Sequence, residues 1–129
     1  MSILLEVIAT SPADCVAAQA GGADRIELCA AMPLGGLTPS LGLLIEARAA
    51  VQLPIMAMIR PRPGGFAYSE SDFAVMLRDA ELALAHGADG IVFGCLQSDG
   101  QVDIDRVRAL VQLAGRRETV FHRAFDVTP

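Results

Sequence analysis

Short apolar runs that contain or end in charged residues recur along this 129-residue chain. The clearest are Leu4–Ile8, Arg25–Cys29, Ile55–Arg60 and Thr119–Arg123. Strands of a parallel sheet are usually covered by helices and read as continuous aliphatic runs. A lone charge is costly to bury unless it is paired or hydrogen-bonded. Ionisable groups collected on such strands therefore predict a shared polar pocket at the strand ends.

Helix signals separate the apolar runs. We expect strands at 3–8, 25–29, 55–60, 90–93 and 119–122. The helices between them are expected to begin after the N-cap residues Ser11, Thr38, Ser69 and Asp103. Strands that alternate with helices in this way predict an α/β fold with a parallel sheet and right-handed crossovers.

The pattern within residues 25–29 distinguishes between two α/β architectures. Side chains alternate along a strand, so Arg25, Glu27 and Cys29 share one face while Ile26 and Leu28 share the other. An open sheet of the flavodoxin kind, covered on both faces, has little room for charged side chains within a strand. The interior of a barrel has room for charged side chains near its mouth, at the C-terminal ends of its strands. The sequence therefore favours a truncated (β/α)8 barrel of the TIM type, with five parallel strands.

Composition excludes several classes of partner. The chain is 53% hydrophobic and 19% charged, which indicates one globular domain. A net charge of −5 and the lack of a basic run argue against nucleic acid and acidic membranes as partners. No apolar stretch approaches the roughly 20 residues that span a bilayer, and we expect no signal peptide.

Cysteine and lysine usage narrow the chemistry further. The three cysteines, Cys15, Cys29 and Cys95, are odd in number and widely spaced, so we expect free thiols and a cytoplasmic location. All ten basic residues are arginine. A chain without lysine cannot act on its own as a lysine-dependent aldolase and has no Walker-type phosphate loop.

A set of polar residues is expected at or just beyond the C-terminal halves of the strands, where barrel enzymes hold their catalytic groups. Its members are Glu6, Arg25, Glu27, Arg60, Arg62, His122, Arg123 and Asp126.

Roles within this set follow from side-chain chemistry. Glu27, kept ionised beside arginines, is a candidate general base, and His122 a candidate proton shuttle near neutral pH. Arg60 and Arg62 are expected to hold a carboxylate or phosphate. The other members, Glu6, Arg25, Arg123 and Asp126, are candidate substrate-binding residues.

The alternative to a functional site is that these residues only form ion pairs with one another. Glu6 would then pair with Arg25, and Glu27 with Arg60. His86 is interpreted as structural, because it falls at a helix end opposite the mouth.

Several stretches resemble the copper homeostasis protein CutC family, in order and at consistent spacing over essentially the whole chain. They are Gly21–Ala30, Leu34–Ser40, Met58–Arg62, Gly87–Gly94, Asp99–Asp103 and Phe121–Asp126. The resemblance implies a (β/α)8 barrel, of which residues 1–129 would lack the last three strand-helix units. It also implies a cytoplasmic protein that handles copper, with Cu(I) as its metal.

The resemblance also implies a metal ligand. Many family members carry a cysteine directly after Glu-Val in the first strand, where this chain has Ile8, and a second cysteine that corresponds to Cys29. Cu(I) favours thiolate and thioether ligands, so Met56 and Met58 on the neighbouring strand would suit a soft site. Methionines within a strand are also common core filler, which is the alternative.

Three functional interpretations stay open from the sequence. The first is a copper-binding protein with Cys29 as ligand. The second is a barrel enzyme that acts on a small anionic metabolite, with a divalent-metal variant that uses Glu27, His122 and Asp126. The third is an incomplete barrel whose open strand edges would drive association into a homo-oligomer.

Overall fold

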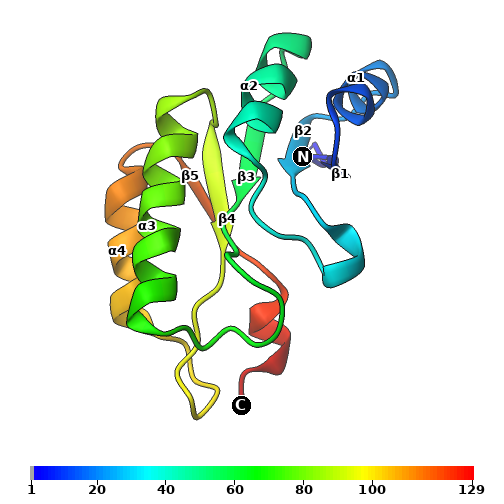
Figure 1. Ribbon diagram of the computed structural model, residues 1–129. Helices are drawn as coiled ribbons and strands as arrows, with labels where there is room; N and C mark the ends of the chain where they lie inside the picture. The colour runs from blue at the N-terminus through cyan, green and yellow to red at the C-terminus, as the bar shows by residue number, and fades with distance from the viewer. Residues whose placement is uncertain (1) are drawn as a thin grey trace.

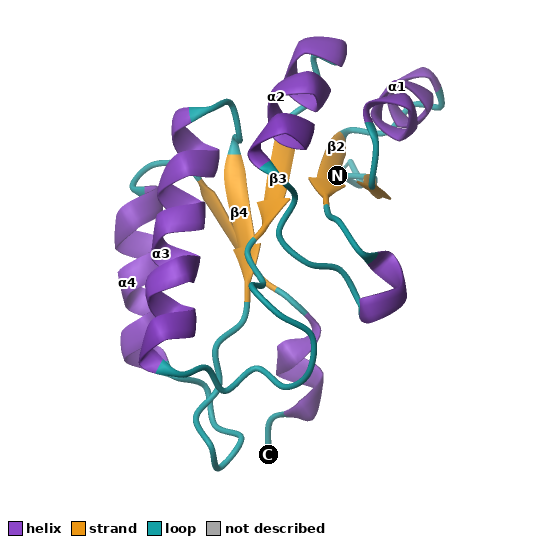
Figure 2. Ribbon diagram, viewed as in Figure 1, coloured by secondary structure: helices purple, strands orange, loops and turns teal. Residues whose placement is uncertain are grey.

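Strands and helices alternate along the chain in the computed structural model, which describes residues 2–129 (Figures 1 and 2). The elements are β1 (Glu6–Ala9), α1 (Pro12–Ala20), β2 (Arg25–Leu28), η1 (Met32–Leu34), α2 (Leu41–Ala50), β3 (Ile55–Met58), α3 (Glu70–Ala85), β4 (Gly90–Phe93), α4 (Ile104–Ala114), β5 (Glu118–Phe121) and η2 (Arg123–Val127). The two η elements are short 3₁₀ helices that follow β2 and β5.

The sheet settles the choice of architecture. Its strands lie in the order β1-β2-β3-β4-β5, and each pairs in parallel with the next. A flavodoxin-like sheet would place the first strand between the second and third. Consecutive parallel pairing is instead the arrangement of a (β/α)8 barrel wall, as the sequence predicted. Within residues 2–129, β1 and β5 each keep one unpaired edge.

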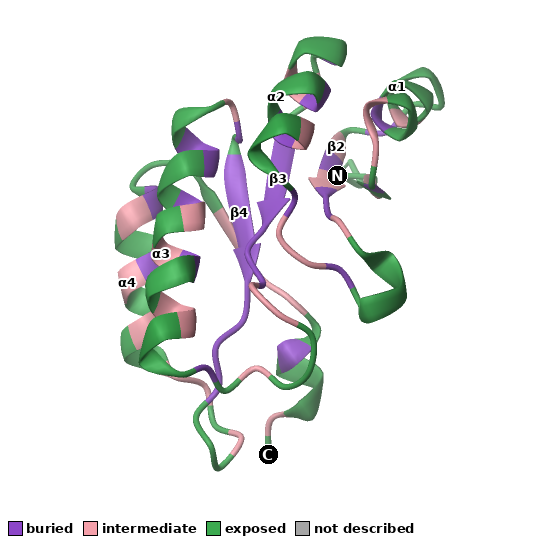
Figure 3. Cartoon of the chain, viewed as in Figure 1, coloured by how far each residue is buried: buried purple, intermediate pink, exposed green. Residues whose placement is uncertain are grey.

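The outer face of the sheet packs against the helices. Ile26, Leu28 and Ile55 belong to a core that includes Cys15 of α1 and Leu44 of α2. A second core lies under α3 and α4, and Ile59, Ile91, Phe93, Met76 and Leu110 are among its members. Figure 3 shows β3 and β4 as the most continuously buried strands. Because these aliphatic side chains occupy the outer face, the alternate side chains of each strand must point to the inner face.

The inner face carries a different set of side chains. Cys29, Met56, Met58 and Val92 pack together there, with Val120 of β5 against them. Glu27 of β2 lies opposite Met56 of β3 in the sheet, so Glu27 points to the inner face as Met56 does. Every second residue from Glu27, which includes Arg25 and Cys29, points to the same face. The expected separation of Arg25, Glu27 and Cys29 from Ile26 and Leu28 is confirmed. Sulfur-rich and polar groups therefore line the concave side.

Three of the four expected helix starts are confirmed. The side chains of Ser11, Ser69 and Asp103 accept the backbone N–H groups of Asp14, Asp72 and Arg106. The exception is α2, which Ser40 caps in place of Thr38. The Thr38 hydroxyl instead accepts the backbone N–H of Arg60 at 2.8 Å, and its own N–H donates to the Arg60 carbonyl at 3.0 Å. Thr38 therefore fixes the chain just beyond β3, next to the candidate site.

No helix among residues 2–129 has both the length and the apolar character needed to cross a bilayer.

Candidate functional site

A pocket of about 370 Å³ opens at the C-terminal ends of the strands. Figure 2 shows that the loops after β2 and β3 run past this end of the sheet. The pocket is lined by Ile8, Glu27, Cys29, Met32, Gly35, Met58, Arg60, Phe66, His122 and Arg123. The pocket therefore brings together six of the residues singled out from sequence, namely Glu27, Cys29, Met58, Arg60, His122 and Arg123.

Arg60 is the most deeply buried charge that lines the pocket, with only 4% of its surface exposed. Its Nη1 donates to the carbonyls of Leu34 at 2.9 Å and Gly36 at 3.1 Å, and its Nη2 donates to the Gly64 carbonyl at 2.9 Å. Neutral carbonyls hold the guanidinium in place but leave its charge uncompensated. Among residues 2–129 no carboxylate forms an ion pair with Arg60, and its Nε is buried without a partner. The alternative pairing of Glu27 with Arg60 is therefore not formed.

The basic side chains of the pocket lie around the ring of Phe66. The guanidinium carbons of Arg60 and Arg123 lie 5.3 and 5.6 Å from the centroid of its ring. The His122 ring centroid lies 5.1 Å away. A Cβ on Gly35 would stand 2.6 Å from Arg123 Nη2 and 3.0 Å from Arg60 Nη1, and Gly35 has φ +92°. Glycine is therefore required at position 35 both for the backbone and for the approach of two guanidinium groups.

His122 is held as a neutral donor. Its Nδ1 accepts the backbone N–H of Ala124 at 3.1 Å, which leaves the proton of the neutral ring on Nε2. That Nε2 is buried and has no partner among residues 2–129. Burial, followed by the positive charges of Arg123 and Arg60, lowers the pKa of His122 to about 4. This lowered pKa does not support the expectation of a proton shuttle near neutral pH.

Glu27 and Cys29 form the less cationic side of the pocket. Burial raises the pKa of Glu27, the Glu6 carboxylate raises it further, and Arg25 opposes these effects. The expectation that nearby arginines keep Glu27 ionised is therefore not supported. Burial, with Glu27 and Glu6, raises the pKa of the Cys29 thiol to about 12. The free thiol is accordingly protonated at neutral pH.

Three sulfur-containing side chains line this side. They are Cys29, Met32 and Met58. A Cβ on Gly36 would stand 3.6 Å from Cys29 Sγ and 3.5 Å from Met32 Sδ, so the glycine leaves the space between these two sulfurs open. Met32 was not predicted, because it lies in the short 3₁₀ helix η1, which has no periodic pattern in the sequence. Within residues 2–129 no three His, Cys, Asp or Glu side chains gather as a metal cluster, which does not support the divalent-metal variant.

Glu6 and Arg25 lie at the other end of the barrel wall, and their predicted place at the mouth is wrong. They are the first residues of β1 and β2, because β1 begins at Glu6 and not near Ile3. Arg25 Nε donates to the Glu6 carboxylate, and Arg25 Nη1 donates to Glu118 Oε2 of β5 at 2.5 Å. The alternative pairing of Glu6 with Arg25 is confirmed. Glu118 was missed, although it shares the strand face of His122 at even spacing.

Arg62 also lies outside the pocket, and its expected role in holding an anion is not supported. Its Nε donates to Asp72 Oδ2 at 2.9 Å, and its Nη1 and Nη2 donate to the carbonyls of Gly65 and Ala67 at 2.8 Å each. The guanidinium carbon also lies 4.8 Å from the Tyr68 ring centroid. These contacts fix the loop after β3 onto the start of α3, so the residue stabilises the rim of the site from outside.

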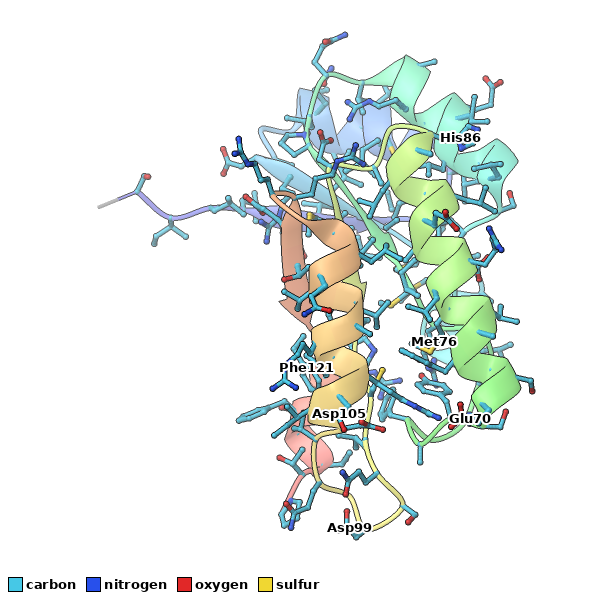
Figure 4. All side chains as sticks on the ribbon, turned by 90° about the vertical axis from the view of Figure 1, so that its left-hand side faces the viewer. Glu70, Met76, His86, Asp99, Asp105 and Phe121 are labelled. Carbon is cyan, nitrogen blue, oxygen red and sulfur yellow. The ribbon has the colours of Figure 1, made fainter. Side chains whose placement is uncertain are left out.

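Asp126 and His86 complete the placement of the sequence-predicted residues. Asp126 is exposed on η2 and does not line the pocket; it borders a neighbouring hollow that shares His122 and Arg123 with the pocket. His86 follows the last residue of α3, where its Nδ1 lies 2.8 Å from the Leu82 carbonyl oxygen. Figure 4 shows His86 at the end of α3 opposite Glu70 and Asp99. The predicted position of His86 away from the mouth is confirmed.

Comparison with known proteins identifies the family. Residues 3–129 match the CutC family over nearly the entire chain. The chain belongs to the CutC family. It is 49% identical over 128 residues to a CutC family protein of Treponema denticola, covering 99% of this chain and 52% of the relative. It is 48% identical over 127 residues to one of Chromobacterium violaceum, covering 98% and 51%. This CutC chain thus spans about half the length of the curated relatives it matches.

Solved structures agree with this assignment. A CutC structure from Streptococcus agalactiae, whose name attributes copper homeostasis to it, superimposes with a TM-score of 0.92 at 33% identity. The match covers 99% of this CutC chain and 62% of that one. A phosphonopyruvate hydrolase matches with a TM-score of 0.61 at 14% identity, which shows the fold alone. The (β/α) barrel architecture is therefore established for this CutC chain.

Proposed function

We propose that this CutC chain acts in copper homeostasis by binding one Cu(I) ion in the pocket at the strand ends. The observation that carries the proposal is the presence of three sulfur-containing residues, Cys29, Met32 and Met58, in the lining of one pocket. Cu(I) is a soft ion that prefers thiolate and thioether ligands. The copper homeostasis name of the Streptococcus agalactiae relative supports the same assignment.

Cys29 would be the principal ligand. It is the one thiol among residues 2–129 that lines the pocket, and its Glu27 neighbour supplies a carboxyl group on the same side. Ile8 lies where many family members are expected to carry a second thiol. We therefore propose a site with a single thiolate completed by thioethers.

The cytoplasm suits a site of this kind. Cys15, Cys29 and Cys95 are all free thiols in the structure. A reducing compartment keeps cysteines in this form. We therefore place the protein in the cytoplasm.

Titration of the reduced protein with Cu(I), against a competing chelator of known affinity, tests the proposal. We expect one ion per chain, and we expect Cys29→Ala to weaken binding by at least about tenfold because the only thiolate ligand is lost. Cys95→Ala is the matched control: Cys95 is also a buried thiol, with a pKa raised to about 12 by burial, but it lies in the core under α3 and α4. Equal Cu(I) affinity in Cys29→Ala and Cys95→Ala would contradict the proposal.

The pH dependence of the same titration supplies a second readout. Because the pKa of Cys29 is raised to about 12, Cu(I) must displace a proton from the thiol at neutral pH. The affinity should then rise by about tenfold per pH unit between about pH 6 and 8, with one proton released per ion. Thioethers do not titrate, and His122, with a pKa of about 4, stays neutral in this range. An affinity that does not change with pH would rule out Cys29 as the ligand.

A further inference from the structure

We propose that the same pocket contains an anion site, in which Arg60, Arg123 and His122 bind the carboxylate of a small organic acid. This site lies around Phe66 and uses none of the sulfur ligands. It is therefore independent of the Cu(I) proposal.

The buried charge of Arg60 is the first support. A guanidinium that is 4% exposed and has no carboxylate partner among residues 2–129 is an unusual arrangement, because buried charges are normally paired. Its three bonds to carbonyls are made by Nη1 and Nη2, and its Nε is buried without a hydrogen bond among residues 2–129. A ligand carboxylate in the pocket would supply the missing negative charge.

Arg123 adds a second cation at the same place. It is exposed, lines the pocket, and forms no ion pair with any carboxylate among residues 2–129. The position that a Gly35 Cβ would take lies within 3.0 Å of nitrogens from both Arg123 and Arg60. Two like charges held this close repel each other unless an anion lies between them. The glycine thus leaves room for their convergence.

His122 supplies an uncharged donor beside the two cations. Its Nδ1 is occupied by Ala124, and its buried Nε2–H is unpartnered within the described residues. The side chains of Arg60 and His122 come from the ends of two different strands, and each keeps one buried N–H free. Both residues line the pocket, so an anion bound there would lie beside the Arg60 charge and the His122 ring.

The lining favours a carboxylate with an apolar body over free phosphate. Phosphate sites are commonly cradled by backbone N–H groups. Here the N–H of Gly35 donates to Met32 and that of Gly36 donates to Ala31, so neither is free. The remaining walls include the apolar side chains of Ile8 and Phe66. A small organic acid would place its carboxylate at the cations and its carbon chain against these walls.

Calorimetric titration of the metal-free, reduced protein with butyrate tests the site. We expect saturable binding of butyrate, with butyramide and inorganic phosphate at the same concentrations binding at least about tenfold more weakly. Arg123→Gln is expected to weaken butyrate binding by a similar factor without unfolding the protein, because Arg123 is exposed and unpaired. Arg116→Gln is the matched control, an exposed arginine just before β5 at the far end of the barrel wall.

Three results would overturn the inference: no butyrate binding, equal binding by Arg123→Gln and Arg116→Gln, or phosphate binding as tightly as butyrate. Because no copper is present, any of these results would leave the Cu(I) proposal untouched. Conversely, a failed Cu(I) titration would leave the anion site standing.

Discussion

Replacing Arg60 with Met is expected to lower the free energy of unfolding by about 3 kcal/mol. The guanidinium joins two loops, since it donates to the carbonyls of Leu34 and Gly36 after β2 and to Gly64 after β3. Removing it leaves three carbonyls without their donors, each worth roughly 1–3 kcal/mol when buried. Relief from burying an unpaired charge offsets part of this loss. Equilibrium unfolding in urea measures the difference.

Arg78→Met is the control for this substitution. Arg78 forms an ion pair with Glu81 one turn along α3, and its side chain is 71% exposed. Exposed pairs of this kind contribute little, so we expect a change below about 0.5 kcal/mol. If Arg60→Met were as stable as the wild type, the guanidinium would not be holding the two loops, and the pocket would lack its proposed anchor.

Acidification is expected to destabilise the wild type through His122. The pKa of His122 is lowered from 6.5 to about 4 in the folded state, first by burial. The unfolded chain therefore takes up a proton at a higher pH than the folded protein does. The stability associated with the neutral ring is complete above about pH 6.5 and is lost as the pH falls towards 4. The size of the shift corresponds to about 3 kcal/mol.

His122→Asn should remove this pH dependence. Comparing the unfolding free energies of the variant and the wild type at pH 7 and at pH 4 isolates the contribution of His122, because Glu27 and the other carboxylates titrate in both proteins. We expect the wild type to lose about 3 kcal/mol more than the variant over this interval. His86→Asn is the control, and it should follow the wild type. An equal loss in His122→Asn and the wild type would show that the ring is not buried as described.

Alternation along the strands allowed much of the site to be predicted from the sequence. Cys29 and Glu27 were placed on the inner face of β2 because Ile26 and Leu28 had to occupy the outer face. His122 follows from the same rule applied to β5. The even spacing in β5 would also have identified Glu118, had the strand been started one residue earlier.

Loop side chains could not be predicted in this way, because they have no periodicity. Arg60 and Arg62 both follow β3, yet one lines the pocket while the other pairs with Asp72 of α3. Only the path of the loop separates these outcomes. Thr38, followed by Pro39, likewise has the sequence pattern of a helix cap, but its hydroxyl accepts the backbone N–H of Arg60 next to the site. These are tertiary contacts that local sequence does not encode.

The edge of β1 shows a further limit of local patterns. Apolar residues 3–5 continue the run that leads into β1, so the sequence placed Glu6 well inside the strand. In the structure, pairing with β2 begins only where Glu6 meets Arg25. A boundary error of three residues moved Glu6 from one end of the barrel wall to the other. Strand ends are set by the partner strand, which a single run of residues does not reveal.

Nitrogen NMR of the ¹⁵N-histidine-labelled protein, recorded from pH 4 to pH 8 with and without butyrate, tests most directly whether one cationic pocket holds a neutral imidazole. We predict that His122 remains the uncharged, Nε2-protonated form down to about pH 4, and that its resonances move when butyrate is added while those of His86 do not. Titration of His122 near its ordinary pKa of 6.5, with no response to butyrate, would contradict the account.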